Sequence, residues 1–81
     1  MPLLSLTIGS WAIESEVADL LRETESAYDG VSIGSYPFFR EGRVGANFVI
    51  RCTDQAQLDR CGAVLCDGLR ALGREAVDGG I

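Results

Sequence analysis

Apolar side chains recur at every second position in two stretches of the chain. Near its start, Leu4, Leu6 and Ile8 alternate with polar residues. The same alternation returns over residues 46–52. A period of two residues is typical of a strand that buries one face. The pattern therefore predicts strands over residues 3–9 and 46–52.

Apolar residues recur at helical spacing in two other stretches. The spacing predicts one helix from Glu14 to about Tyr28 and a second that opens at Thr53 and Asp54. Asp54 is suited to cap the second helix, and Gly73 is suited to end it. The stripes expected to face the core are Ile13, Val17, Leu20, Leu21, Thr24 and Tyr28 in the first helix, and Leu58, Cys61, Leu65, Leu69 and Leu72 in the second.

The segment between the two helices predicts a β-hairpin. Its first strand covers residues 31–39, and its loop has Gly42 and Gly45 at the two ends. Pro37 lies inside that first strand and has no backbone N–H to donate, so the strand belongs at a sheet edge or at a bulge. After the second helix, residues 75–77 predict a short fourth strand, and the last four residues are expected to form a frayed tail.

The order of these elements is β-α-β-β-α-β, which is that of the ferredoxin-like folds. We therefore expect an α+β two-layer sandwich, in which a four-stranded sheet carries both helices on one face. Right-handed crossovers place the first and third strands in the middle of such a sheet and the second strand at an edge. Pro37 would then lie where a proline is tolerated.

Composition and charge narrow the classes of partner. The chain has 81 residues, a length typical of a single small domain, and a net charge of −5. An acidic chain is poorly suited to nucleic acids and to anionic membranes. The charge is uneven, because residues 31–53 carry three Arg against one Glu, a net of +2, while the segments on either side are acidic.

Cysteine use and the chain start bear on location and on metal binding. There are three Cys and no His, and residues 1–11 show neither a basic start nor a long apolar run, which favours reduced thiols in the cytoplasm. Cys61 and Cys66 are five positions apart on the second helix, about 140° around its axis, so the two thiols cannot coordinate the same metal ion. Glu16, Asp19 and Glu23 are typical of a solvated helix face. No metal site is expected.

Two short motifs match known catalytic or nucleic-acid-binding patterns, but the secondary structure around them differs from what those patterns require. Residues 30–34 match the G-x-S-x-G nucleophile elbow, which needs a strand before it, a helix after it and a His base nearby. Here Ser32 follows a helix and begins a strand. Residues 42–45 match the G-x-x-G loop of KH domains, but they join two strands and favour a hairpin turn. No catalytic residue is assigned, and an enzyme is not expected.

The hairpin holds the best candidates for a binding surface. Aromatic rings beyond the need of the core, beside Arg40 and Arg43, would form an apolar patch with a cationic rim. Such a patch indicates contact with a partner or an anionic ligand, and plain core packing is the other explanation of the rings. The candidate binding residues are Tyr36, Pro37, Phe38, Phe39, Arg40 and Arg43.

The same hairpin resembles a known family. The sequence VSIGSYPFFREGRVGANFVIRCTD, with ESEVADLL before it and LRALGRE after it, resembles the tail of CinA-like competence/damage-inducible, molybdopterin-binding-type proteins, which are related to one half of eukaryotic FAD synthase. In that family a small ferredoxin-like or KH-like domain follows a larger domain that carries the Gly-rich binding segments. The resemblance implies that residues 1–81 are a single small domain, the C-terminal piece of a longer protein. It also implies that molybdopterin or a nucleotide binds to a domain outside this chain, with no cofactor in the chain itself.

These observations lead to one expected function and two alternatives. We expect an accessory domain that packs beside a nucleotide- or pterin-binding domain, either a preceding domain of the same protein or a second subunit. Neither nucleic acid nor membrane is an expected partner. The first alternative is a regulatory module that binds a small molecule on the same fold. The second is KH-like RNA binding through the loop of residues 42–45.

Overall fold

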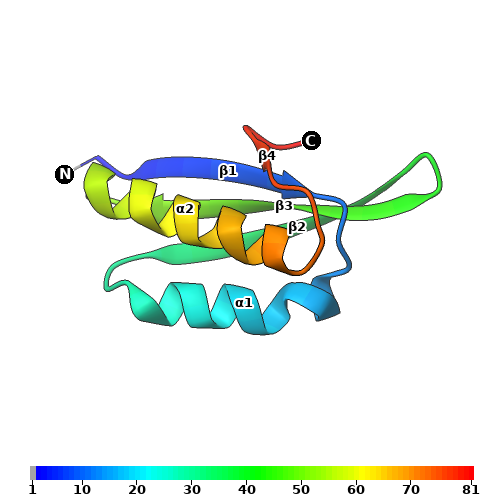
Figure 1. Ribbon diagram of the computed structural model, residues 1–81. Coiled ribbons are helices and arrows are strands. Elements are labelled where there is room, and N and C mark those ends of the chain that lie inside the picture. The colour runs from blue at the N-terminus through cyan, green and yellow to red at the C-terminus, as the bar shows by residue number, and fades with distance from the viewer. Residues whose placement is uncertain (1) are drawn as a thin grey trace.

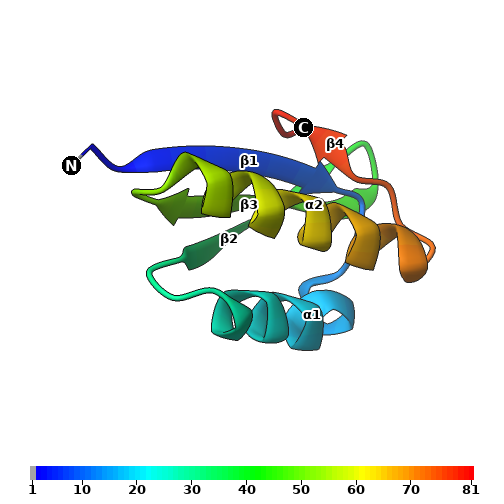
Figure 2. The ribbon, with the colours of Figure 1, turned by 60° about the vertical axis from the view of Figure 1, so that its left-hand side comes forward.

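The computed structural model describes residues 2–81, in which a four-stranded antiparallel sheet carries two helices on one face (Figures 1 and 2). The strand order is β2-β3-β1-β4, so the first and third strands are central. The predicted ferredoxin-like β-α-β-β-α-β arrangement is confirmed. The elements are β1 (Leu4–Ser10), α1 (Glu14–Ala27), β2 (Ser32–Arg40), β3 (Arg43–Cys52), α2 (Gln55–Ala71) and β4 (Val77–Asp78).

The edge position of β2 explains how the sheet accommodates Pro37. The proline lies opposite Ala46 of β3, and no strand pairs with its other side. A missing N–H therefore costs no hydrogen bond within the sheet. The prediction that this strand lies at an edge is confirmed.

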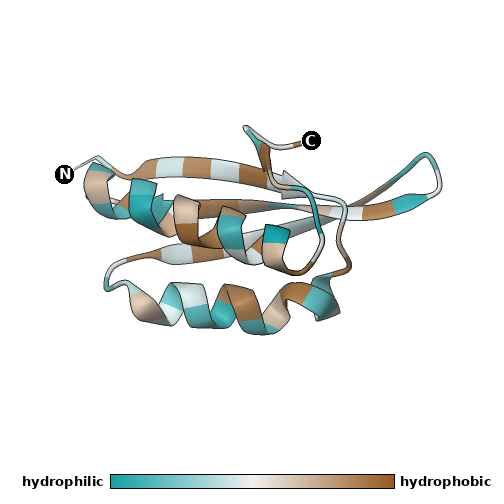
Figure 3. Cartoon of the chain, viewed as in Figure 1, coloured by the Kyte–Doolittle hydropathy of each residue, from teal (hydrophilic) through white to brown (hydrophobic). Residues whose placement is uncertain are grey.

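The core lies between the sheet and the helices. Alternate residues of β1 and β3 point into it, as the banding of hydropathy along β1 in Figure 3 illustrates. The fully buried side chains with the largest volume include Phe48, Ile8 and Ile50 from the sheet and Leu65 and Leu69 from α2. The expected stripe of α2 is buried up to Leu69, whereas Leu72, just past the end of the helix, is half exposed.

The first helix buries less of its predicted stripe than the second. Val17 and Thr24 are buried, while Leu20, Leu21 and Tyr28 are only partly covered. Ile13 is exposed, so its place in the expected stripe is wrong. It caps α1 instead of facing the core, and its backbone N–H and C=O bond with Glu16.

The hairpin turn is tighter than the loop expected from the sequence. Arg40 and Arg43 pair directly, so the turn consists of Glu41 and Gly42, whose φ angles of 52° and 76° are both positive. Such a two-residue turn matches the twist of the strands that it joins. The expected loop end at Gly45 is therefore wrong, because Gly45 lies within β3, opposite Phe38. The paired strands run on as a long arm that projects past both helices (Figure 1).

The last residues are held against the sheet, so the expected frayed tail is wrong. The Gly79 N–H donates to the Thr7 carbonyl at 2.9 Å. The Asn47 side chain accepts from the Ile81 N–H at 2.8 Å and donates to the Ile81 carbonyl at 3.1 Å. Ile81 also lies so close over Gly9 that a Cβ there would be 2.7 Å from its side chain. The tail thus covers part of the sheet face that the helices leave free.

Replacing Asn47 should release this tail. For Asn47→Ala we expect faster hydrogen exchange at the Ile81 and Gly79 amides, measured by NMR, because both side-chain hydrogen bonds are lost. The free energy of unfolding should fall by about 1–2 kcal/mol. Asn47→Asp is the comparison variant, since it keeps an acceptor for the Ile81 N–H but puts a charged oxygen in place of the donor to the Ile81 carbonyl. Unchanged exchange at Ile81 in the alanine variant would show that the side chain does not hold the tail.

Candidate functional site

The strand pairing divides the predicted binding residues between the two faces of the sheet. Pro37 lies opposite the buried Ala46 and shares the helix-side face. Phe39 has the same parity along β2. The other four predicted residues point to the opposite face, here called the open face: they are Tyr36, Phe38, Arg40 and Arg43. The hairpin therefore presents two distinct surfaces, where the sequence suggested one.

Four side chains on the open face form a single stack. The rings of Trp11 and Phe38 meet edge to face, with centroids 5.3 Å apart and planes at 83°. The Arg40 guanidinium lies 4.4 Å from the centroid of Phe38, and that of Arg43 lies 4.3 Å from the centroid of Trp11. Both distances are in the range of cation–π attraction, and the ring geometry is the favoured T-shape. These four residues are here called the Trp-Arg cluster.

A glycine makes room for the Trp-Arg cluster. Phe38 lies opposite Gly45, and a Cβ on Gly45 would stand only 2.6 Å from Cζ of the Phe38 ring. The ring can therefore lie across β3 and reach Trp11, which follows directly after β1. Trp11, which was not among the candidate binding residues, thus lies over the open face. Trp11 lies two residues after Gly9, a position of β1 that faces the open side of the sheet. The alternation of β1 therefore points the Trp11 side chain to the open face, and this alternation was the sequence signal that could have shown it.

Within the described part of the chain, the arginines of the open face have no carboxylate partners. Among residues 2–81 the ion pairs join Asp19 to Arg22, Asp67 to Arg70 and Glu16 to Arg74. Arg40 and Arg43 of the Trp-Arg cluster take part in none of them. Arg51, which the sequence did not single out, shares the open face, and its Nη2 lies 3.4 Å from the Tyr36 hydroxyl. Among residues 2–81, an acidic chain thus concentrates on one face three guanidinium groups that form no ion pair with a carboxylate.

The rings of the hairpin are less buried than alternation suggested. Phe38 is partly covered, Tyr36 is half exposed, and Phe39 is 70% exposed. Plain core packing, the other explanation of these rings, therefore does not account for Tyr36 and Phe39. Tyr36 and Phe38 point to the open face, away from the core, whereas Phe39 points to the helix side but belongs to the arm, which runs past the helices and has no layer packed against it there (Figure 1).

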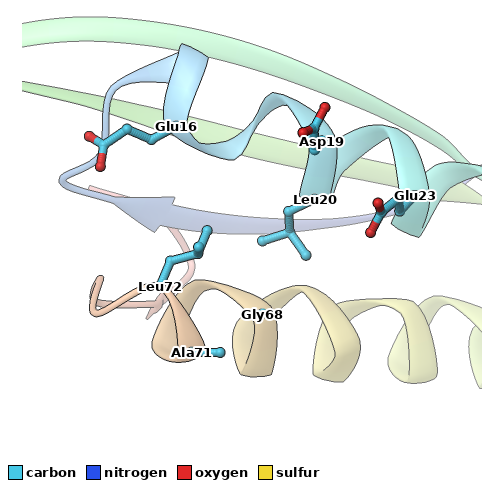
Figure 4. Close-up of a pocket in the computed structure, with 7 residues that line it drawn as sticks. All are labelled: Glu16, Asp19, Leu20, Glu23, Gly68, Ala71 and Leu72. Carbon is cyan, nitrogen blue, oxygen red and sulfur yellow. The ribbon is translucent and has the colours of Figure 1, made fainter.

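A groove of about 310 Å³ lies between α1 and α2 (Figure 4). Leu20 of α1 and Leu72, just past the end of α2, extend into it from opposite sides, and Leu20 packs directly against Gly68. At one end of the groove, Arg74 donates to Glu16 at 2.5 Å, and this hydrogen bond lowers the pKa of that carboxyl. The lining residues are Glu16, Asp19, Leu20, Glu23, Gly68, Ala71 and Leu72. This set is here called the interhelical groove.

The thiols and carboxylates that the structure describes lie apart from one another. Within residues 2–81, no three His, Cys, Asp or Glu side chains lie close enough together to hold a metal ion. Cys52 and Cys61 are buried and Cys66 is half-buried, all as free thiols. Burial raises the pKa of the Cys61 and Cys66 thiols, which keeps them protonated at neutral pH. Ser32 of the apparent elbow motif begins β2, as the sequence indicated.

Neither helix in the described part of the chain is long and apolar enough to cross a membrane.

Comparison with known proteins assigns the sequence to a family and supports the fold. The family described as FAD synthase, middle domain, matches residues 2–76. No curated protein matches the chain. Among solved structures, the de novo designed protein Foldit4 is similar, with a TM-score of 0.77 and 15% sequence identity over 95% of this chain and 96% of that one. At that identity the likeness concerns the fold alone.

The family match corrects the resemblance drawn from the hairpin sequence. That resemblance pointed to CinA-like, competence/damage-inducible proteins of the molybdopterin-binding type, and it is wrong, because the matching family is the FAD synthase middle domain. The family match extends over residues 2–76, well beyond the hairpin segment that carried the resemblance.

Proposed function

Since this chain belongs to the family of FAD synthase middle domains, we propose that it is a non-catalytic interaction domain within a longer protein of that type. Its role is to dock against a neighbouring domain or a second subunit through the open face. The observation that carries this proposal is the Trp-Arg cluster, whose two stacked arginines have no acidic partner among residues 2–81.

The chemistry of the cluster favours a carboxylate-bearing protein surface. A guanidinium stacked on an aromatic ring keeps its planar fork of N–H donors free at the edge, and that fork matches a carboxylate with two parallel hydrogen bonds. Trp, Tyr and Arg are the residues that most often dominate binding energy at protein interfaces. The open face holds all three types, as Trp11, Tyr36, Arg40, Arg43 and Arg51.

A small anionic aromatic ligand is the second candidate for the same face. Stacked rings and guanidinium groups suit the base and the phosphates of a nucleotide. Small-molecule sites are usually concave, however, and the groove described above lies between the helices and not on the open face. The shape therefore favours a protein partner. Titration with ATP or FAD distinguishes a protein partner from a small ligand. The fluorescence of the single tryptophan, Trp11, is measured during the titration, and only ligand binding predicts a saturable change in it.

Charge reversal in the Trp-Arg cluster tests the docking proposal. In a FAD synthase-type protein that carries this domain, we expect Arg40→Glu combined with Arg43→Glu to weaken association of the domain with the rest of the protein by at least about thirtyfold, as for loss of an interface hot spot. The measurement is isothermal titration of the separately produced chain against the remainder of that protein.

Two further variants make this result specific. Arg40→Lys with Arg43→Lys keeps the charge but removes the planar fork, so an intermediate loss is expected. Arg60→Glu on the exposed surface of α2 makes the same kind of charge change away from the open face and should leave affinity unchanged. If the double Glu variant binds with full affinity, the open face is not the docking surface.

A further inference from the structure

The outer edge of β2 has the composition of a strand that pairs readily with others. The strand is nine residues long, and among residues 2–81 no strand lies on its outer side. It is rich in residues of high strand propensity, and its one charged residue, Arg40, stands at its end. A long apolar strand with a row of unpaired N–H and C=O groups is a template for pairing with another chain. This edge would therefore accept an added strand unless something blocks it.

The pairing register shows which backbone groups of β2 face outward. Arg40 and Arg43 flank the two-residue turn, and residues that flank such a turn exchange both of their backbone hydrogen bonds. Bonding alternates along an antiparallel pair, so the even-numbered residues of β2 bond to β3. The odd-numbered residues point their N–H and C=O groups away from β3. The outward positions are residues 33, 35, 37 and 39, and a strand that added to this edge would bond to them.

Two of the four outward positions have no N–H to offer. The Ile33 N–H already donates to the Glu25 carboxylate of α1 at 2.7 Å. Pro37 has no N–H at all. The remaining donors are those of Ser35 and Phe39, and the proline lies between them. An added strand would therefore find no two consecutive donors along this edge and would lose half of the hydrogen bonds that β2 could donate to it.

The Glu25 carboxylate is well placed to block the edge. It takes part in none of the ion pairs among residues 2–81, so the Ile33 N–H is the partner that the structure gives it. The helix that carries it runs alongside β2 (Figures 1 and 2). A charged group laid on an exposed edge also disfavours an approaching strand, because the carboxylate would lose water without gaining a new partner.

We infer that Glu25 and Pro37 together block strand addition to the edge of β2, whether by another copy of this chain or by an extended segment of another protein. The two residues cover different parts of the edge. Loss of the Glu25 carboxylate opens the donors of Ile33 and Ser35, whereas loss of the proline opens those from Ser35 to Phe39. The inference does not rest on the docking proposal, which uses the open face, and either can fail alone.

Removing both blocks tests the inference. Pro37→Thr provides three consecutive donors, Glu25→Ala provides two, and the double variant provides all four. Each added hydrogen bond strengthens association by about two- to tenfold. In sedimentation velocity over a range of concentration, we therefore expect the double variant to associate at least about tenfold more strongly than either single variant. Glu25→Gln combined with Pro37→Thr is the matched control, since it loses the same charge but keeps an acceptor for the Ile33 N–H, and it should associate no more than Pro37→Thr alone.

Hydrogen exchange measured by NMR locates the contact. In the wild-type chain the Ile33 amide should exchange slowly and those of Ser35 and Phe39 rapidly, and Glu25→Ala should speed exchange at Ile33. In the double variant, protection of Ser35 and Phe39 should rise with protein concentration, because an added strand bonds to these outward amides.

Three results would each overturn the inference. They are a folded double variant that associates no more than the wild-type chain, association without protection of the Ser35 and Phe39 amides, and wild-type protection of these amides that rises with concentration. Circular dichroism verifies that the variants are folded. If the double variant unfolds, Pro37→Thr alone makes the same test over three donors.

Discussion

Phe48→Ala is expected to lower the free energy of unfolding by about 3–5 kcal/mol. Phe48 is fully buried on the central strand β3, between Ile8 of β1 and Ser35 of β2, and faces the helices. Its removal loses apolar burial and leaves a cavity that strands held on both sides cannot close. Domains of this length are stable by only about 0.05–0.15 kcal/mol per residue, so the loss is a large part of the total.

Thermal and urea denaturation of the isolated chain measure this effect. In a domain of this size each kcal/mol corresponds to about 4–8 °C in the unfolding temperature. Val49→Thr is the matched control, because Val49 is the next residue on the same strand and points to the open face. That substitution should change stability by about 0.5 kcal/mol or less. Comparable losses in both variants would contradict the assignment of the core to one face of the sheet.

Gly45→Val is expected to destabilise the domain by about 1–3 kcal/mol and to break the Trp-Arg cluster. The backbone of Gly45 has no positive φ, so the strand conformation itself tolerates valine. The space does not. A Cβ would stand 2.6 Å from the Phe38 ring and 2.9 Å from the Ser10 carbonyl oxygen. The ring can move away, but the backbone oxygen is held in the sheet, so both strain and loss of the stack follow.

The single tryptophan reports the loss of the stack. We expect the emission of Trp11 to change in Gly45→Val, because Phe38 no longer packs against the indole. Gly42→Ala is the control: its φ of 76° makes alanine costly, by about 1 kcal/mol, but nothing lies near a Cβ at that position. It should therefore lower stability and leave the emission unchanged. An unaltered spectrum in Gly45→Val would mean that the ring of Phe38 does not depend on the space above this glycine.

The fold could be predicted because its signals are local or topological. The alternation of Leu4, Leu6 and Ile8 is visible in any window of a few residues and reports the buried face directly. Pro37 restricts its strand to an edge through a missing donor, whatever surrounds it. Right-handed crossovers then leave one order for the four strands.

The candidate site could be predicted only in part. The sequence singled out Phe38, Arg40 and Arg43 but not Trp11, and it treated Phe39 as part of the same surface. Which ring meets which guanidinium depends on the register of β2 against β3, and that register depends on the two-residue turn at Glu41 and Gly42. A turn longer by one residue would have turned every later side chain of β3 to the other face.

The sequence by itself determined the order of elements, the central strands and the positive charge of the hairpin, because periodicity, proline chemistry and charge are properties of single residues and of their spacing. Only the tertiary structure decided that the hairpin becomes an arm with two different faces, one carrying the Trp-Arg cluster and one ending in Phe39 and Val44. It also decided that the last residues are bound by Asn47 and not free. These features arise where residues far apart in the chain meet, and the distance between them is set by how the whole sheet and its helices pack.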